Sequence, residues 1–395
     1  MIDILIFILL GLLAGVGFGL VPGLHPNMIV LLVPILAQVN IPALPLIAFI
    51  VSIGVSNTFL DFIPSMLLGA AEEGTEMSVL PSHKMLMEGN GYEAVKLAVI
   101  GGLGSLVVIA ILLPVIIFAV PNIYFFIRPV TYAILIFIVG IMVFSEKGII
   151  PKSISLLCFF LAGLIGAVSQ QLPINHTFLL FPILSWLFGV SLLLFSSNKK
   201  IKVRHKKKEV FVSSRLQRRS ILLGSLGGIS SGMLPGVGSS EIASMASIDK
   251  NEKSFLITLG AITMSNTLLS IMALWLIEKS RSGIAVVLEQ LVQIGLNETI
   301  FIAGVALLVA GVSAVITLIV AKKTLSVISK INYAVISRSI IILIVIMTIL
   351  FTGPYGLLLL ITCTALGIFA NLCGIRRGIL MGTLILPTII FYLPF

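Results

Sequence analysis

The sequence predicts an all-α polytopic membrane protein made of two inverted-topology repeats with broken or re-entrant helices. Three observations lead to this fold class: the composition, the placement of the basic residues and an internal repeat. Of the 395 residues, 58% are hydrophobic and only 10% are charged, and the mean hydropathy is +1.21. A soluble domain is about one quarter charged, so this composition excludes a soluble enzyme and a disordered scaffold.

Long apolar runs recur along the whole chain, at 5–22, 97–120, 130–145, 154–169, 177–195, 300–321, 340–351 and 357–370. Several reach the roughly 20 residues that an α-helix needs to cross hydrocarbon. Their hydrophobicity is continuous, whereas the strands of an outer-membrane barrel alternate. The first run lacks a basic flank and a small-residue cleavage site, so we expect a retained helix and not a signal peptide.

One stretch, 199–219, holds 10 of the 25 Lys and Arg residues. Between two spanning segments such a stretch indicates a cytoplasmic loop, and without interleaved aromatic residues it does not indicate nucleic-acid binding. Counting crossings outward from this loop places most other basic residues inside, Arg128, Lys279 and Arg281 outside, and both termini outside. We therefore expect a multi-pass protein of the cytoplasmic membrane.

The chain contains an internal repeat in two registers. Gly11, Gly15, Gly19, Pro22 and Gly23 recur 213 positions later as Gly224, Gly228, Gly232, Pro235 and Gly236. The glycines at every fourth position line one helix face, where we expect another helix backbone to approach closely. Ser56-Asn57-Thr58 recurs 209 positions later as Ser265-Asn266-Thr267. The halves are then 1–198 and 220–395, joined by the basic linker 199–219. Because equivalent loops fall on opposite sides in the charge count, the halves resemble the inverted repeats of secondary transporters, with substrate near the midplane.

Two kinds of motif within the repeat point to a binding site. Each Pro-Gly pair is expected to break a helix at membrane depth, which requires burial or a polar cavity. His25 and Asn27 follow the first pair, and Ser239 and Ser240 follow the second.

Each Ser-Asn-Thr triplet offers two hydroxyls and an amide that could coordinate Na⁺ or bind a carboxylate. The alternative is an ordinary helix N-cap. We expect helix breaks near Asn57 and Asn266, with all four breaks converging.

Two acids complete the candidate site. Asp61 lies in apolar surroundings, where an acid is a functional candidate, although the repeat aligns it with Ser270. Glu241 follows the second Pro-Gly pair, and the alternative for both acids is an interface or vestibule. The candidate substrate- or ion-binding residues are Ser56, Asn57, Thr58, Ser265, Asn266, Thr267, Pro22, Gly23, Pro235, Gly236, His25, Asn27, Ser239, Ser240, Asp61 and Glu241.

Enzyme signatures do not account for these residues. Residues 228–232 match G-x-S-x-G, but that motif requires a strand–turn–helix context, and the first copy of the repeat has no serine there. No P-loop and no H-E-x-x-H sequence occurs, and the four histidines are scattered. We expect no enzyme activity and no cofactor other than Na⁺ or H⁺ as a coupling ion.

Three segments resemble a known family. Pro64-Ser65-Met66-Leu67-Leu68, Gly89-Asn90-Gly91-Tyr92-Glu93-Ala94 and Ile100-Gly101-Gly102-Leu103-Gly104 are similar to the large permease subunit of tripartite tricarboxylate transporters, the TctA family. The chain resembles a short, archaeal-type member, and it departs from the family pattern at 69–73 and 81–84. The resemblance implies a tricarboxylate permease that works with a small membrane subunit and an extracytoplasmic binding protein. The paired triplets also look like the binding tips of divalent anion/Na⁺ symporters.

The function predicted is secondary-active transport of a small, carboxylate-type organic anion by alternating access, coupled to Na⁺ or H⁺. The alternative is a translocase for a lipid-linked phosphate such as polyprenyl phosphate. A membrane scaffold is a third hypothesis, which the duplicated breaks disfavour because packing alone does not require them. The substrate, the coupling ion, the direction and the oligomeric state stay open, a homodimer being one option.

Overall fold

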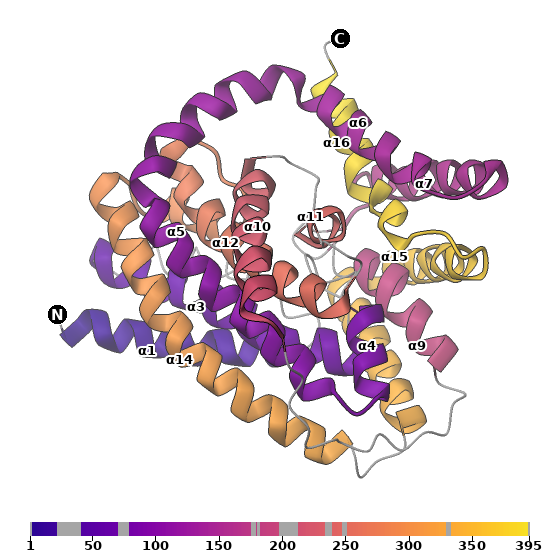
Figure 1. Ribbon diagram of the computed structural model, residues 1–395, viewed down its shortest axis with the longest axis horizontal. Coiled ribbons are helices and arrows are strands. Elements are labelled where there is room, and N and C mark those ends of the chain that lie inside the picture. Colours follow the sequence, from indigo (N-terminus) through magenta and orange to yellow (C-terminus); the bar gives the residue numbers. More distant parts are fainter. Residues whose placement is uncertain are drawn as a thin grey trace.

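A computed structural model of the chain describes residues 2–21, 41–69, 79–174, 179, 182–196, 212–233, 239–246, 251–328 and 333–393. Every regular element among them is helical (Figure 1). In chain order they are α1 (Ile2–Leu20), α3 (Ala43–Ile63), η2 (Pro64–Leu68), α4 (Val79–Met87), α5 (Gly91–Ile127), η4 (Arg128–Val130), α6 (Thr131–Phe144), α7 (Ile149–Ser169), η5 (Ser185–Val190), α9 (Ser191–Ser196), α10 (Ser214–Met233), α11 (Ser239–Ala246), α12 (Glu252–Leu276), α13 (Gly283–Leu291), α14 (Leu296–Ile328), α15 (Tyr333–Leu372), η7 (Arg377–Met381) and α16 (Gly382–Tyr392).

The predicted membrane-spanning character is confirmed. Within the described residues, seven helical segments are long and apolar enough to cross a bilayer. They are Ile2–Leu20, Ala43–Leu68, Gly91–Phe144, Ile149–Ser169, Glu252–Leu276, Leu296–Ile328 and Ser337–Leu372. The segments containing α3 and α12 are mostly buried, whereas those containing α1, α5 and α15 leave most of their surface exposed. The exposed residues are largely apolar, as expected for a surface that faces lipid.

The helices form two hydrophobic cores. The first core is built from α1, α3, α5, α10, α12 and α14, and the second from α6, α7, η5, α15 and α16. In Figure 1 α5 runs along the first core and continues through α6 into the second. Leu68 and Ile242 pack against both cores. Each core contains helices that precede the basic linker 199–219 and helices that follow it. The division of the chain into two halves at this linker stays a prediction.

Within the first core, helices pack crosswise between the two parts of the chain. α5 packs on α12, and α14 packs on α3. Glycines allow the α5–α12 approach, because a methyl group on Gly101 would meet the Ile257 carbonyl and one on Gly260 would meet the Ala98 carbonyl. Small residues at such crossings let helix backbones approach closely in membranes. At the end of α4, Lys84 forms an ion pair with Glu252 at the start of α12, and this hydrogen bond raises the pKa of Lys84.

The prediction of helix breaks near Asn57 and Asn266 is wrong. Asn57 lies inside the continuous helix α3, and Asn266 lies inside α12. The polar triplets do not open the helix because their hydroxyls donate to carbonyls one turn earlier. The distances are 2.6 Å from Ser56 Oγ to Ser52 O, 2.8 Å from Thr58 Oγ1 to Gly54 O, 2.7 Å from Ser265 Oγ to Ala261 O and 3.0 Å from Thr267 Oγ1 to Thr263 O.

Irregular backbone occurs at other positions. α3 passes into the π-helical turn η2 at Pro64 and ends at Gly69, whose φ of 74° suits glycine. α15 is interrupted at Gly353, with φ 60° and ψ −151°, before Pro354. π-helical turns are often associated with functional sites, and η2 begins three residues after Asp61.

Several predicted positions lie outside the described residues. Pro22, Gly23, His25, Asn27, Pro235 and Gly236 are among them. The preceding helices end close by, α1 at Leu20 and α10 at Met233. Ser239 and Ser240 begin α11, which also contains the backbone of Glu241.

Candidate functional site

The first triplet lies on the face of α3 against which α1 packs. A methyl group on Gly11 would meet the Phe49 carbonyl and Ser52, and one on Gly15 would meet Ser56 and the Ile53 carbonyl. At Gly19 it would meet the Asn57 carbonyl, Leu60 and the Asp61 N–H. The glycine face of α1 therefore seats its backbone directly on the polar stretch 52–61 of α3.

The second triplet has the same surroundings. Gly224 packs on the Thr258 carbonyl and Ala261, Gly228 on Ser265 and the Ile262 carbonyl, and Gly232 on Leu269 and Asn266 Oδ1. The glycines are offset by 213 positions from those of α1, and their contacts are offset by 209 positions from those of α3. Equivalent residues of the proposed repeat thus meet equivalent partners.

The two triplets contact each other through their threonines. Thr58 Oγ1 lies 3.1 Å from Thr267 Oγ1, and Thr58 is only 8% exposed. Each hydroxyl also lies within hydrogen-bond distance of its own helix carbonyl. The two hydroxyls have two protons for three hydrogen-bond contacts, two to carbonyls and one to each other. Their oxygen lone pairs therefore outnumber the available protons. Such a pair suits a cation or a hydrogen-bond donor.

The asparagines lie beside this contact along each helix. Asn57 is 4% exposed, and its Oδ1 has no hydrogen-bond partner among the described residues. Asn266 is partly exposed and directs Oδ1 toward the side of Gly232. A buried carbonyl oxygen without a partner is unfavourable by about 1–3 kcal/mol. A ligand that donates to Asn57 or coordinates through it would remove this penalty.

Asp61 lies one helical turn after Asn57 and is 6% exposed. Its main-chain carbonyl accepts a hydrogen bond from Ser65 Oγ at 2.6 Å in the π-helical turn. An acid buried at membrane depth is a functional candidate. Ser270, which the repeat aligns with Asp61, donates to Ser282 Oγ at 3.2 Å, so the two positions differ in chemistry.

The remaining predicted residues fall into two groups. Ser56 and Ser265 are fully buried against Gly15 and Gly228, so both serve the packing of the helix pairs. Ser239 and Ser240 are buried in α11, which packs on α10 and α12.

Sequence reasoning missed Arg281, which the charge count placed in an outer loop. Its Nη2 donates to the Tyr124 hydroxyl and to the Met233 carbonyl, both at 3.1 Å. The guanidinium also stacks on the Tyr124 ring, 5.3 Å from its centroid. A cation at the C-terminal end of α10 is favoured by the helix dipole. No pattern in the sequence joins these three residues, which come from three separate elements.

Metal-ligand clusters do not explain the site. Across the part of the chain that the structure describes, no group of three or more His, Cys, Asp or Glu side chains could hold a metal ion. Among the residues whose side chains the structure describes, the polar groups at the centre are neutral hydroxyls and amides beside the Asp61 carboxyl.

These features define a multi-pass helical membrane protein with a buried polar centre between two helix pairs. Residues 5–382 match the family described as Tripartite tricarboxylate transporter TctA family. The chain belongs to this family and is a multi-pass membrane transporter, as its resemblance to the family predicted. The uncharacterized protein MJ1079 of Methanocaldococcus jannaschii is 29% identical over 408 residues, covering 98% of this chain and 99% of that protein. No solved structure matched the chain.

Proposed function

We propose that the protein is a secondary-active permease for a small, carboxylate-type organic anion. The anion binds between the two triplets, and inverted halves, 1–198 and 220–395, expose this site alternately to the two sides of the membrane. Transport is coupled to Na⁺ or H⁺. The observation that carries the proposal is the 3.1 Å contact between Thr58 and Thr267.

The proposed repeat makes Thr58 and Thr267 equivalent by symmetry. Two equivalent residues can touch each other only near the axis that relates their repeats. The matching glycine contacts of α1–α3 and α10–α12 support the same relationship, as does the crosswise packing of α5 on α12 and α14 on α3. Secondary transporters with inverted repeats bind substrate at the repeat interface.

The chemistry of the centre supports an anion together with a coupling ion. The two asparagine amides supply neutral donors for a carboxylate, and Arg281 adds positive charge at the end of α10. Asp61, buried on α3, is the residue we assign to the coupling ion, either as a Na⁺ ligand or as a proton carrier. Spare lone pairs at Thr58 and Thr267 suit the same cation.

The family's name denotes a three-part transporter, and we include a small membrane subunit and an extracytoplasmic binding protein in the proposal. Because transport would then need those partners, the first test measures binding. The purified chain is heated with citrate, succinate or inorganic phosphate, each with Na⁺ or with K⁺. We expect a saturable rise in melting temperature with a carboxylate, larger in Na⁺ or dependent on pH.

Variants separate the proposed site from non-specific effects. Asn57→Ala and Asn266→Ala should lose the carboxylate effect. Thr362→Val should keep it, because Thr362 is exposed on α15 and its hydroxyl donates to the Leu358 and Leu359 carbonyls of the same helix. A melting temperature that responds to polyprenyl phosphate and to no carboxylate would replace the proposal with the lipid-linked phosphate translocase.

A further inference from the structure

A groove of about 470 Å³ lies away from the triplets, between the two cores. It is lined by Pro81 of α4, Phe255 of α12, Asn371 near the end of α15 and residues 374–377, which follow α15. Phe255 precedes Ser265 by ten residues on α12, which is about 15 Å along a helix axis. This groove is therefore separate from the proposed transport site.

Arg377 lines the groove, is buried and has a guanidinium nitrogen without a hydrogen-bond partner among the described residues. The residue is 8% exposed. Its Nε donates to Asn371 Oδ1 at 2.8 Å and its Nη1 to the Phe188 carbonyl at 3.3 Å. The remaining nitrogen, Nη2, has no partner among the described residues, and neither has the amide nitrogen of Asn371.

No carboxylate within the described residues forms an ion pair with Arg377. A buried charge without a counter-charge is strongly unfavourable. Arg377 and Asn371 both line the groove, and their mutual hydrogen bond holds the two unused N–H groups on one rigid pair. This is the donor arrangement that binds a carboxylate or phosphate group through two oxygens.

We propose that the groove is a second anion-binding site, in which Arg377 Nη2 and Asn371 Nδ2 hold a carboxylate or phosphate group. Pro81 and Phe255 give the groove apolar walls. The ligand therefore carries apolar atoms next to its charged group, or lipid chains cover these walls. A soluble organic anion and an anionic lipid headgroup share this chemistry.

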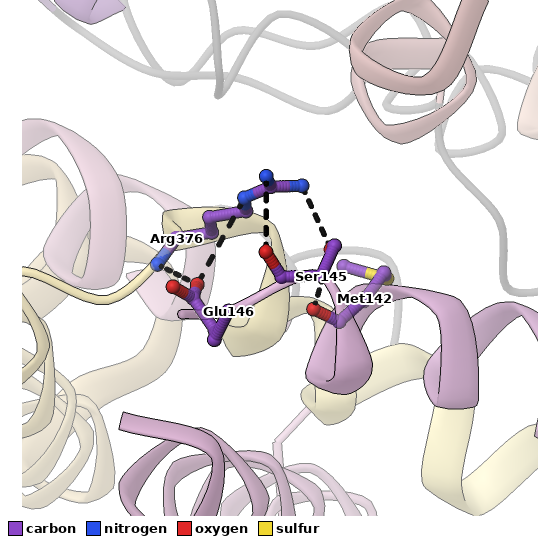
Figure 2. Close-up of polar contacts among 4 residues, drawn as sticks. All are labelled: Met142, Ser145, Glu146 and Arg376. Carbon is purple, nitrogen blue, oxygen red and sulfur yellow. Dashed lines mark hydrogen bonds and ion pairs between the residues drawn. The ribbon is translucent and has the colours of Figure 1, made fainter. Parts of the chain in front are cut away.

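The neighbouring Arg376 provides a matched control. Its guanidinium donates to Ser145 Oγ at 2.8 Å and to the Ser145 carbonyl at 3.5 Å, and its main-chain N–H donates to Glu146 Oε1 at 2.9 Å (Figure 2). Nε lies 3.9 Å from the same carboxylate oxygen. The side chain of Arg376 is thus held by the turn between α6 and α7, whereas Arg377 forms no ion pair with an acid of the described ranges.

The experiment titrates citrate and inorganic phosphate into the Asn57→Ala chain in phosphatidylcholine nanodiscs, following thermal stability, because this background removes the carboxylate effect expected at the proposed transport site. Arg377→Gln should raise the dissociation constant by about tenfold or more, as expected for losing a charged hydrogen bond. Arg376→Gln also removes a positive charge from the groove lining, but it removes no donor of the Arg377–Asn371 pair, so it should change the dissociation constant by less than about threefold. Stabilisation that persists in the Asn57→Ala background and is weakened by Arg377→Gln separates this site from the proposed transport site.

A second variant covers the case in which Arg377→Gln does not fold. Asn371→Asp places a carboxylate beside the guanidinium, so it should preserve or raise the melting temperature while abolishing anion binding. The lipid source is tested in nanodiscs that contain phosphatidylglycerol. Stabilisation by that lipid alone, lost in Asn371→Asp, supports the site with a headgroup as its ligand. No stabilisation of the Asn57→Ala chain by any of these anions, or equal stabilisation of that chain with and without Asn371→Asp, overturns the proposal.

Discussion

Thr58 and Thr267 stand 209 positions apart in the chain, and their hydroxyl oxygens lie 3.1 Å apart in the structure. The contact joins α3 to α12 at the positions that the repeat makes equivalent. It also shows why both triplets tolerate a helical backbone, since each hydroxyl satisfies a carbonyl of its own helix and still reaches its counterpart.

The first prediction concerns this pair. Thr58→Val and Thr267→Val preserve shape and remove one hydroxyl each. Because the two hydroxyls interact, the double variant should lose less stability than the sum of the single variants, with a coupling of about 0.5–1.5 kcal/mol. Unfolding in mixed micelles, followed by tryptophan fluorescence, measures this. Strictly additive losses would mean that the contact contributes nothing.

The second prediction concerns the asparagines. Asn57→Ala and Asn266→Ala should each weaken transport by about tenfold or more, because each removes a donor from a poorly hydrated site at about 1–3 kcal/mol. Uptake of labelled carboxylate into cells that also express the partner subunits measures this, with Thr362→Val as the control. Wild-type affinity in both asparagine variants would reduce the triplets to packing elements.

The third prediction concerns coupling. Asp61→Asn keeps the size of the side chain and removes its charge, so uptake should lose its dependence on Na⁺ or on pH. Initial rates at varied Na⁺ and pH test this in wild type and variant. An unchanged dependence with a lower maximal rate would assign Asp61 to structure and not to the coupling ion.

The fourth prediction compares two glycines of α1. Gly15→Ala should destabilise the protein by about 1–3 kcal/mol, because the added methyl group meets Ser56 and the Ile53 carbonyl. Gly17→Ala, two residues away with nothing within 4 Å, should be neutral or should stabilise the helix by up to about 1 kcal/mol. Melting temperatures of both variants decide the matter, and equal effects would contradict the packing of α1 on α3.

The fifth prediction concerns orientation. Ser214, which is exposed at the start of α10, should react with a membrane-impermeant thiol reagent only from the cytoplasmic side once changed to cysteine. Arg128, exposed in η4, should react from the outside after the same change. The background replaces Cys158, Cys363 and Cys373. Labelling of the Ser214 variant from outside alone would reverse the predicted topology.

The spanning helices could be predicted from the sequence, because a helix that crosses lipid must consist of a long run of apolar residues. The family could be predicted from the three short segments that resemble it. The backbone at Asn57 and Asn266 was not predictable in the same way. The same Ser-Asn-Thr sequence can cap the start of a helix or can donate back to carbonyls inside a helix. Only the backbone conformation of the folded chain distinguishes the two cases.

The positions of the two unusual arginines also could not be predicted. Arg377 is held by the Phe188 carbonyl, 189 positions earlier, and Arg281 by Tyr124, 157 positions earlier. Both arginines sit in segments whose charge indicates a loop. The burial of Arg377 and the hydrogen bonds of Arg281 depend on contacts between elements far apart in the chain. The glycine spacing, in contrast, predicted a close helix approach correctly, because it depends on one helix face only.

The crosswise packing of the first core has a consequence for biogenesis. At about 5–20 residues per second, the ribosome completes Thr267 roughly 10–40 seconds after Thr58. During that interval α1 already covers the Ser56 face of α3, but α12, which carries the partner of Thr58, and α14 do not yet exist. The insertion machinery must therefore shelter the Thr58 side of α3 until the later helices arrive, and a chain truncated before α12 is expected to be a substrate for membrane quality-control proteases.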